Sequence, residues 1–170
     1  MARGRRIGLL GLGSNVGDRR AQLQAATSAL GPRGVRVRRS SSVYDTDPVG
    51  EVLDQPSFLN ACLEVSASLA PRELLAVCKA LERELGRPHG GVRHGPRTID
   101  IDVLLLGSEV VSDGELTVPH PALLQRRFVL IPALELDDGL ALPDGRRLAD
   151  ALAALPVGEG VRWAGPPLEV

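Results

Sequence analysis

The segment TIDIDVLLL at residues 98–106 alternates polar and apolar side chains before it becomes continuously apolar. This pattern predicts a β-strand, because successive side chains of a strand point to opposite faces of its sheet. The apolar residues of the alternation would face the core: Ile99, Ile101, Val103 and Leu105. Asp100 and Asp102 would share the other face, with Cα atoms roughly 6.6 Å apart. The chain must therefore build a sheet whose second face tolerates two neighbouring carboxylates.

The segments before this strand alternate between strand-like and helix-like patterns. Strands are predicted over residues 7–12, 35–44, 59–69 and 98–106, and helices from the capping residues 15–18 to about residue 30 and over residues 71–85. The order strand, helix, strand, strand, helix, strand is that of the ferredoxin-like βαββαβ fold. We therefore expect an α/β (α+β) protein with an antiparallel sheet, helices packed on one face and the other face left for a site.

The C-terminal part of the chain is predicted to extend this core. A helix is expected over residues 124–136, with a kink or break at Pro132, because proline cannot donate the helical hydrogen bond. A turn at 143–145, a short helix at 148–155 and a strand at 161–163 should follow. A length of 170 residues with 44% apolar composition favours one domain over residues 1–170.

The bulk composition argues against several classes of protein. The formal net charge of −1 provides no general attraction to nucleic acid or to anionic membranes. No apolar run approaches the roughly 20 residues of a membrane span, and no signal-peptide pattern is present. Cys62 and Cys78 lie in apolar periodic segments, where we expect them to be buried. We expect a cytoplasmic protein that binds neither nucleic acid nor membrane.

The paired aspartates suggest a cation site. Two neighbouring carboxylates repel each other unless a cation lies beside them. Mg²⁺ prefers oxygen ligands and is often held by one or two carboxylates together with substrate phosphates. Two such ions could hold the attacking and leaving oxygens of a transfer reaction. The alternative is an ordinary solvent-facing side of an amphipathic strand.

An arginine-rich loop precedes the aspartates. Residues 86–97, GRPHGGVRHGPR, contain four glycines and two prolines, which excludes regular structure. Arg87, Arg93 and Arg97 could bind phosphate groups, because a guanidinium donates two hydrogen bonds at once. The segment could therefore act as a lid over a metal-bound triphosphate. The alternative is a solvated basic loop.

The other candidate features are weaker. GLGSNVGD at residues 11–18 lacks the G-K-[ST] of a phosphate-binding P-loop, so on its spacing it is a strand-to-helix turn. The aromatic residues are few: Tyr44, Phe58, Phe128 and Trp163. Phe58 and Phe128 could fill the core or could stack on a flat ring. In the second case, Asn60 would offer a donor and an acceptor to the edge of that ring.

Together these segments resemble the 6-hydroxymethyl-7,8-dihydropterin pyrophosphokinases of folate biosynthesis. The matching pieces are GLGSNVGD at 11–18, DQPSFLN at 54–60, GPRTIDIDVLL at 95–105 and LTVPHPALLQRRFVLIPALEL at 116–136. They follow the family's order and span most of the chain, and G-P-R-T-x-D-x-D is a specific signature. The resemblance implies a ferredoxin-like enzyme, usually monomeric. It would transfer pyrophosphate from ATP to the hydroxymethyl group of the pterin and release AMP and the pterin diphosphate.

The resemblance also implies roles for individual residues. Asp100 and Asp102 would hold two Mg²⁺ ions that bridge the ATP phosphates, and Arg87 and Arg97 would stabilise charge on the transferring group. The remaining contacts to ATP would come from Glu82, Thr117, His120 and Arg126. The pterin pocket would be formed by Thr46, the backbone of Val49, Phe58, Asn60 and Phe128.

The chain departs from the family pattern around the loop. It has His94 where the family often has tryptophan, His89 and Gly90 where further basic residues are common, and Pro121 in place of tyrosine. We expect these differences to affect how the loop closes and how strongly ATP is bound, more than the type of reaction.

Two other functions fit parts of the pattern. A palm-type nucleotidyltransferase also places paired carboxylates on a ferredoxin-like sheet, but it gives no reason for Phe58, Asn60 and Phe128 to converge. A non-catalytic RNA- or ligand-binding domain of this fold would need aromatic residues on its strands, which are nearly absent here. The product formed from ATP distinguishes these possibilities.

Overall fold

The computed structural model describes residues 4–48, 54–86, 98–156, 158 and 160–170. The strands are β1 (Arg6–Ser14), β2 (Val35–Ser40), β3 (Val43–Thr46), β4 (Phe58–Ala67), β5 (Asp100–Leu106), β6 (Val111–Ser112), β7 (Thr117–Val118) and β8 (Val161–Gly165). The helices are α1 (Arg19–Leu30), α2 (Pro71–Glu84), α3 (Arg127–Leu136) and α4 (Leu148–Ala154), with 3₁₀ turns at Gly31–Arg33 and Leu123–Gln125. The predicted order of the first six elements is confirmed.

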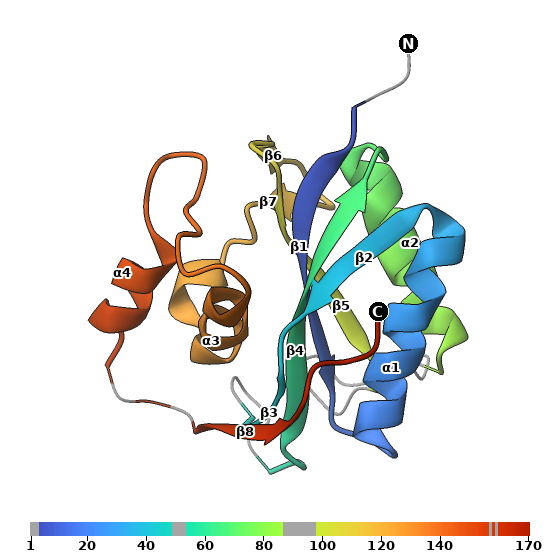
Figure 1. Cartoon of the computed structure of the whole chain (residues 1–170), viewed down its shortest axis with the longest axis vertical. Helices are drawn as coiled ribbons and strands as arrows, with labels where there is room; N and C mark the ends of the chain where they lie inside the picture. The colour runs from blue at the N-terminus through green and yellow to red at the C-terminus, as the bar shows by residue number, and fades with distance from the viewer. Residues whose placement is uncertain (1–3, 49–53, 87–97, 157, 159) are drawn as a thin grey trace.

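The main sheet is antiparallel and has the order β5-β1-β4-β3-β8, with β2 also paired to β4. In this order β1 is an interior strand between β5 and β4, and β5, which carries the aspartates, is an edge strand (Figure 1). This is the arrangement of a ferredoxin-like fold, as predicted. The small hairpin of β6 and β7 was not anticipated, because each of its strands has only two residues.

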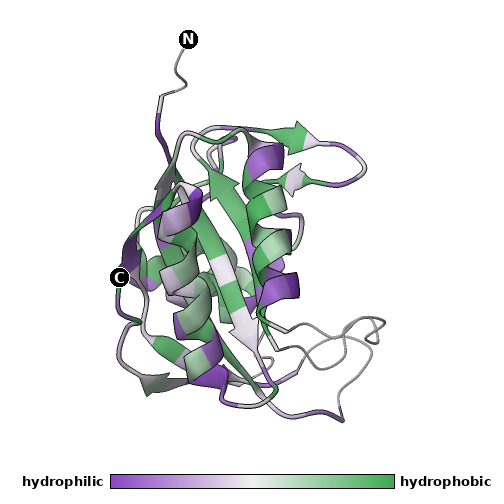
Figure 2. Cartoon of the chain, turned by 90° about the vertical axis from the view of Figure 1, so that its right-hand side faces the viewer, coloured by the Kyte–Doolittle hydropathy of each residue, from purple (hydrophilic) through white to green (hydrophobic). Residues whose placement is uncertain are grey.

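The helices α1 and α2 pack on one face of the sheet, and their ends follow the sequence signals. The carboxylate of Asp18 accepts a hydrogen bond from the N–H of Ala21 at 3.1 Å and caps α1. The carboxylate of Glu73 accepts from the N–H of Ala70 at 3.0 Å at the start of α2. Gly86 follows α2 with a φ of 97°, a conformation that suits glycine. Figure 2 shows the apolar strands behind these two helices.

The second face of the sheet is not left open, which corrects the expectation of helices on one face only. Figure 1 shows α3 and α4 on the side opposite α1 and α2. The buried apolar residues accordingly form two clusters. One cluster lies between the sheet and α1 and α2, with Leu10, Leu63 and Leu81 at its centre. The other joins the sheet to α3 and includes Leu104 and Leu130.

The predicted strand 35–44 is interrupted at Ser41. The N–H of Cys62 donates to the Ser41 side-chain oxygen at 2.9 Å, and the N–H of Ser41 donates to the Cys62 carbonyl. A side chain therefore replaces one backbone acceptor, which divides the segment into β2 and β3. Cys62 itself is buried, as predicted, and burial raises the pKa of its thiol.

The break expected at Pro132 occurs six residues earlier. Residues 123–125 form a 3₁₀ turn, Arg126 is extended, and α3 then runs continuously from Arg127 through the buried Pro132 to Leu136. Pro132 is the sixth of the ten residues of the helix, and its missing N–H removes one helical hydrogen bond, to the carbonyl of Phe128. Extended Arg126 thus redirects the chain instead of the proline.

The alternation in β5 also ends earlier than predicted. Ile99, Ile101 and Val103 join the cluster beneath α1 and α2, but Leu105 joins the cluster beneath α3. The pairing with β1 shifts by one residue, because Leu10 pairs with Val103 and Leu9 with Leu105. This bulge reverses the facing of Leu105.

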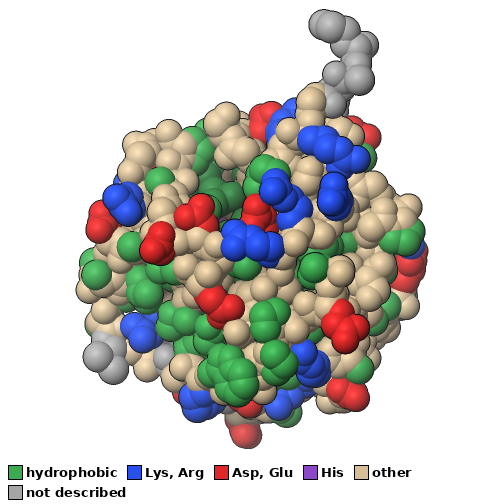
Figure 3. Space-filling view, viewed as in Figure 1, with side chains coloured by type: hydrophobic (Ala, Val, Ile, Leu, Met, Phe, Trp, Pro, Cys, Tyr) green, Lys and Arg blue, Asp and Glu red, His purple; other side chains and the backbone are tan. Residues whose placement is uncertain are grey.

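Among the residues that the structure describes, no helix is long and apolar enough to cross a membrane. Figure 3 shows Lys or Arg side chains interspersed with Asp or Glu side chains on the face viewed.

The packing of α2 gives a stability prediction. Leu74 is fully buried, whereas its neighbour Leu75 is only partly buried. We expect Leu74→Ala to lower the free energy of unfolding by about 2–4 kcal/mol, because it leaves a cavity in the core. The matched variant Leu75→Ala should lower the free energy of unfolding clearly less, because Leu75 is only partly buried. Denaturant unfolding followed by circular dichroism measures both, and equal losses would contradict the assigned facing of α2.

Candidate active site

The pairing of β1 places the sequence-predicted residues in one row. Gly13 pairs with Asp100 of β5 on one side and with Asn60 of β4 on the other. Gly11 pairs in the same way with Asp102 and Cys62. Directly paired residues share a face of the sheet. Asp100, Asp102 and Asn60 therefore lie on the face that α3 partly covers, and Asp100 and Asn60 are roughly 10 Å apart across two strand spacings.

Gly13 has a steric role that spacing alone did not reveal. A Cβ atom there would lie 2.9 Å from the Asn60 side-chain nitrogen, closer than a side chain can approach. Residues 11–14 also belong to β1, so only the second half of GLGSNVGD is a turn. The sequence interpretation of this segment as a turn was therefore half right. Glycine at position 13 lets the Asn60 side chain lie across β1.

The Asn60 side chain is fixed by two hydrogen bonds. Its Nδ2 donates to the Leu12 carbonyl at 3.2 Å, and its Oδ1 accepts from the Thr46 hydroxyl at 2.5 Å. Thr46 is buried and pairs with Phe58 across the strands. Three of the residues predicted to form a ring-binding pocket thus lie together at one end of the row. Of the other two residues predicted for this pocket, Phe128 comes from α3 and Val49 lies outside the described residues.

The other end of the row is acidic, with a buried carboxylate beside it. Glu82 of α2 is 1% exposed, and its Oε2 accepts from the N–H of Ile101 at 3.0 Å. Its Oε1 lies 3.1 Å from the ammonium of Lys79. Glu82 therefore provides a hydrogen-bond acceptor for a backbone N–H of the edge strand β5, next to Asp100. Lys79 was not singled out from the sequence, although its i, i+3 spacing to Glu82 on a helix is a usable signal.

The carboxylates perturb each other. Burial, a hydrogen bond with Asp100 and the charge of Asp100 raise the pKa of Glu82 to about 7. Burial and the charge of Asp100 raise the pKa of Asp102 to about 7, although Arg126 opposes the rise. The site thus carries more negative charge than it can stabilise alone, which is the situation that a bound cation relieves.

The segment that enters α3 brings three further predicted residues to this face. The His120 N–H donates to the Leu104 carbonyl of β5 at 2.9 Å, and its Nδ1 accepts from the Ala122 N–H at 3.1 Å. Burial and the charge of Arg126 lower the pKa of His120, which favours the neutral ring. Because Nδ1 accepts a hydrogen bond, the proton of the neutral ring lies on Nε2. The guanidinium of Arg126 lies 5.6 Å from the centre of the Phe128 ring, a cation–π contact.

The remaining predicted residues are less constrained by the structure. Thr117 is exposed on β7 and pairs with Ser112. Arg87 and Arg97 lie outside the described residues, as does the rest of the arginine-rich loop.

The two aspartates form a donor set that suits Mg²⁺. Among the residues described, no three His, Cys, Asp or Glu side chains form a metal-holding group. Asp100 and Asp102 supply oxygen ligands from adjacent same-face positions, and burial together with the charge of Asp100 raises the pKa of Asp102. This fits an ion that takes only one or two protein carboxylates and completes its shell with water or phosphate.

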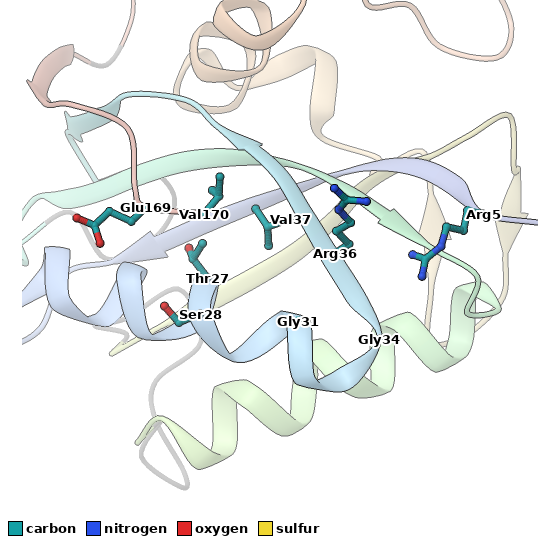
Figure 4. Close-up of a pocket in the computed structure, with 9 residues that line it drawn as sticks. All are labelled: Arg5, Thr27, Ser28, Gly31, Gly34, Arg36, Val37, Glu169 and Val170. Carbon is teal, nitrogen blue, oxygen red and sulfur yellow. The ribbon is translucent and has the colours of Figure 1, made fainter.

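A pocket on the opposite side of the sheet is separate from this row. It has a volume of about 370 Å³ and is lined by α1, the start of β2 and the C-terminal tail, with Arg5, Thr27 and Arg36 among its residues (Figure 4). None of the residues predicted from the sequence to bind substrate lines it.

Comparisons with known proteins agree with the sequence resemblance. The family model for 7,8-dihydro-6-hydroxymethylpterin-pyrophosphokinase (HPPK) matches residues 9–138. A 2-amino-4-hydroxy-6-hydroxymethyldihydropteridine pyrophosphokinase of Bacillus subtilis is 46% identical over 131 residues, which are 76% of this chain and 77% of the relative. The protein of the same name from Pseudomonas aeruginosa is 43% identical over 152 residues, covering 88% of this chain and 91% of the relative.

Some relatives are much longer. A folate synthesis bifunctional protein of Arabidopsis thaliana is 41% identical over 75% of this chain, but the match spans only 26% of that protein. A crystal structure of wild-type Plasmodium falciparum HPPK-DHPS superposes with a TM-score of 0.68 at 14% identity. It covers 89% of this chain and 45% of the solved chain. At this identity the structural match supports the fold alone.

The raised pKa of Asp102 gives a pH-dependent prediction for the metal-free protein. An acid whose pKa is higher in the folded state destabilises the fold as it ionises, so stability falls as the pH rises from about 4 to about 7. We expect Asp102→Asn to remove this loss of stability. Its free energy of unfolding should rise by on the order of 1–2 kcal/mol at pH 8, but change little at pH 4.

Urea unfolding at pH 4, 6 and 8 in the presence of a chelator tests this. The control is Asp138→Asn, which changes an exposed carboxylate after α3. If Asp102→Asn changes the free energy of unfolding equally at pH 4 and pH 8, the predicted destabilisation by ionised Asp102 is wrong.

Proposed function

The chain belongs to the 7,8-dihydro-6-hydroxymethylpterin-pyrophosphokinase family, and we propose that it transfers the pyrophosphoryl group of ATP to the hydroxymethyl group of 6-hydroxymethyl-7,8-dihydropterin. The products are AMP and the pterin diphosphate, and the reaction is a step of folate biosynthesis. The observation that carries the proposal is the row Asp100–Gly13–Asn60. This row places an acidic end, at Asp100, and the proposed ring-binding end, at Asn60, on one face of the sheet, roughly 10 Å apart.

The ring-binding end suits a pterin. We propose that the pterin lies between Phe58 and Phe128, where a flat heteroaromatic ring can stack. Asn60 and Thr46 would recognise the edge of the ring, together with the backbone of Val49. Their mutual hydrogen bond supports this, since it holds the Asn60 amide in one orientation before the ring arrives.

The acidic end suits the phosphates of ATP. We propose that Asp100 and Asp102 hold two Mg²⁺ ions, which would neutralise charge on the phosphates and on the transferring group. Glu82 supports ATP binding from behind β5, next to Asp100. On the other side of the site, neutral His120 can donate from Nε2, and Arg126 and Thr117 complete the ATP contacts.

The step itself is an in-line displacement at the β-phosphorus of ATP. The hydroxymethyl oxygen forms a new bond to this phosphorus, the bond to the bridging oxygen of AMP breaks, and the hydroxyl proton is released. The protein positions the two substrates and offsets charge, because little covalent chemistry is asked of it. We propose that Arg87 and Arg97 stabilise the charge that grows on the transferring group. We also propose that one domain, residues 1–170, does this as a monomer.

The product of the reaction tests the proposal directly. Purified protein is mixed with ATP, Mg²⁺ and the pterin, and the nucleotides are separated by chromatography. We expect pterin-dependent AMP together with a diphosphorylated pterin. Pterin-dependent ADP would mean transfer of a single phosphoryl group, and release of pyrophosphate would instead favour a nucleotidyltransferase.

Loss of one aspartate should abolish turnover. We expect Asp100→Ala to reduce kcat by about a thousandfold, because electrostatic stabilisation of the transferring group is lost. The fold should persist, since the hydrogen bond of Glu82 to Ile101 does not involve this side chain. Steady-state AMP formation and circular dichroism measure the two effects. Asp138→Asn is the control, and near-normal turnover of Asp100→Ala would contradict the metal-holding role.

A further inference from the structure

The helix that carries Phe128 is tied to the sheet at its opposite end. The Glu135 carboxylate, in the last turn of α3, accepts from the Tyr44 hydroxyl at 2.5 Å and from the Ser42 N–H at 2.7 Å. Both donors come from the segment that contains β3. Phe128 lies at the other end of α3, within its first turn. The helix therefore connects these hydrogen bonds at its last turn to the aromatic ring at its first turn.

A second tie holds the same end of the helix. The Arg39 guanidinium donates to the Leu136 carbonyl at 2.6 Å and to the Glu64 carboxylate at 2.7 Å. This tie reaches strand β2 and the far part of β4. It anchors α3 to the sheet without touching the strand residues that are predicted to bind the ring.

Tyr44, in contrast, lies directly beside those residues. It pairs with Asn60 across β3 and β4, and it is two positions before Thr46, whose hydroxyl bonds to Asn60. Residues at i and i+2 of a strand share a face. The phenol of Tyr44 thus connects the strand pair that carries Thr46 and Asn60 to the helix that carries Phe128.

The hydroxyl of Tyr44 is a permanent donor. Burial, followed by its hydrogen bond to Glu135 and the charge of that carboxylate, raises the pKa of Tyr44 to about 12. Glu135 is exposed, yet its carboxylate receives two donors from the same segment. A carboxylate with two fixed donors has one preferred position, so these hydrogen bonds help to fix the last turn of α3 relative to β3.

We propose that Tyr44 and Glu135 are a positioning pair that sets the gap between Phe128 and the opposite wall formed by Phe58 and Asn60, and thereby its selectivity for a flat, fused heteroaromatic ring. This inference rests on the proposed function, because it assigns these two walls to the pterin. Neither residue touches the ring or the reacting phosphate in this assignment. Their effect is confined to the pterin half of the site.

The test separates pterin binding from ATP binding. The pterin is titrated calorimetrically into protein that holds Mg²⁺ and a non-hydrolysable ATP analogue, and the analogue is titrated separately. We expect Tyr44→Phe to weaken pterin binding about tenfold, because one charge-assisted hydrogen bond is lost. The affinity for the analogue should stay within twofold of wild type.

Two further variants identify the mechanism. Glu135→Gln keeps an acceptor oxygen and should retain most of the pterin affinity. Glu135→Leu should weaken pterin binding at least as much as Tyr44→Phe, because it also loses the hydrogen bond from the Ser42 N–H. The double variant Tyr44→Phe/Glu135→Leu should bind the pterin no more weakly than Glu135→Leu alone, because the Tyr44–Glu135 hydrogen bond is already absent in Glu135→Leu. Arg33→Gln is the matched control, since it removes an exposed hydrogen bond to Glu84 that lies away from the site.

Each outcome decides the inference. Unchanged pterin affinity in Tyr44→Phe would overturn it. Equal losses for the pterin and the analogue, accompanied by a lower Tm, would also overturn it, because they indicate a purely structural role. Wild-type protein that binds no pterin would overturn the proposed function and this inference together, whereas wild-type binding with an unaffected Tyr44→Phe overturns the inference alone.

Discussion

The candidate site depends on the register in which β1 pairs with both of its neighbours. Gly13 faces Asp100 on one side and Asn60 on the other, so a single strand aligns the two ends of the site. A slip of one residue between β1 and β5 would turn both aspartates toward α1 and α2, into an apolar core. The apolar residues Ile99, Ile101 and Val103 oppose such a slip, because it would turn them away from the core in which they are buried.

One face of β5 has to serve two purposes. Near its start, Asp100 and Asp102 face a region where charge is useful, and near its end, Leu104 and Leu105 face the apolar cluster under α3. The bulge opposite Leu9 and Leu10 makes this change possible, since it brings two consecutive leucines to the same side. The boundary between site and core therefore lies within one strand of seven residues.

The sequence predicts the frame well, because regular hydrophobic spacing determines it. The buried face of α2, the capping of α1 and the strand that carries the aspartates all follow from local patterns. Features that depend on distant contacts were not predictable. The contact of Gly13 with Asn60 requires the strand order, and the role of Glu135 requires the docking of α3. The break in the helix was predicted at Pro132 and occurs at Arg126, because proline is a stronger local signal than an arginine that becomes extended in the fold.

The sheet separates two apolar clusters that have no residue in common. Cooperative units of a protein often coincide with such separately packed regions, and they open with different free energies. The cluster that includes Leu123 and Leu130 holds α3 and α4, and the larger cluster holds the frame around β1 and β4. Phe128 packs against the cluster that holds α3, whereas the strands that carry Thr46 and Asn60 are held by the larger cluster, so the two walls of the ring-binding end need not open together.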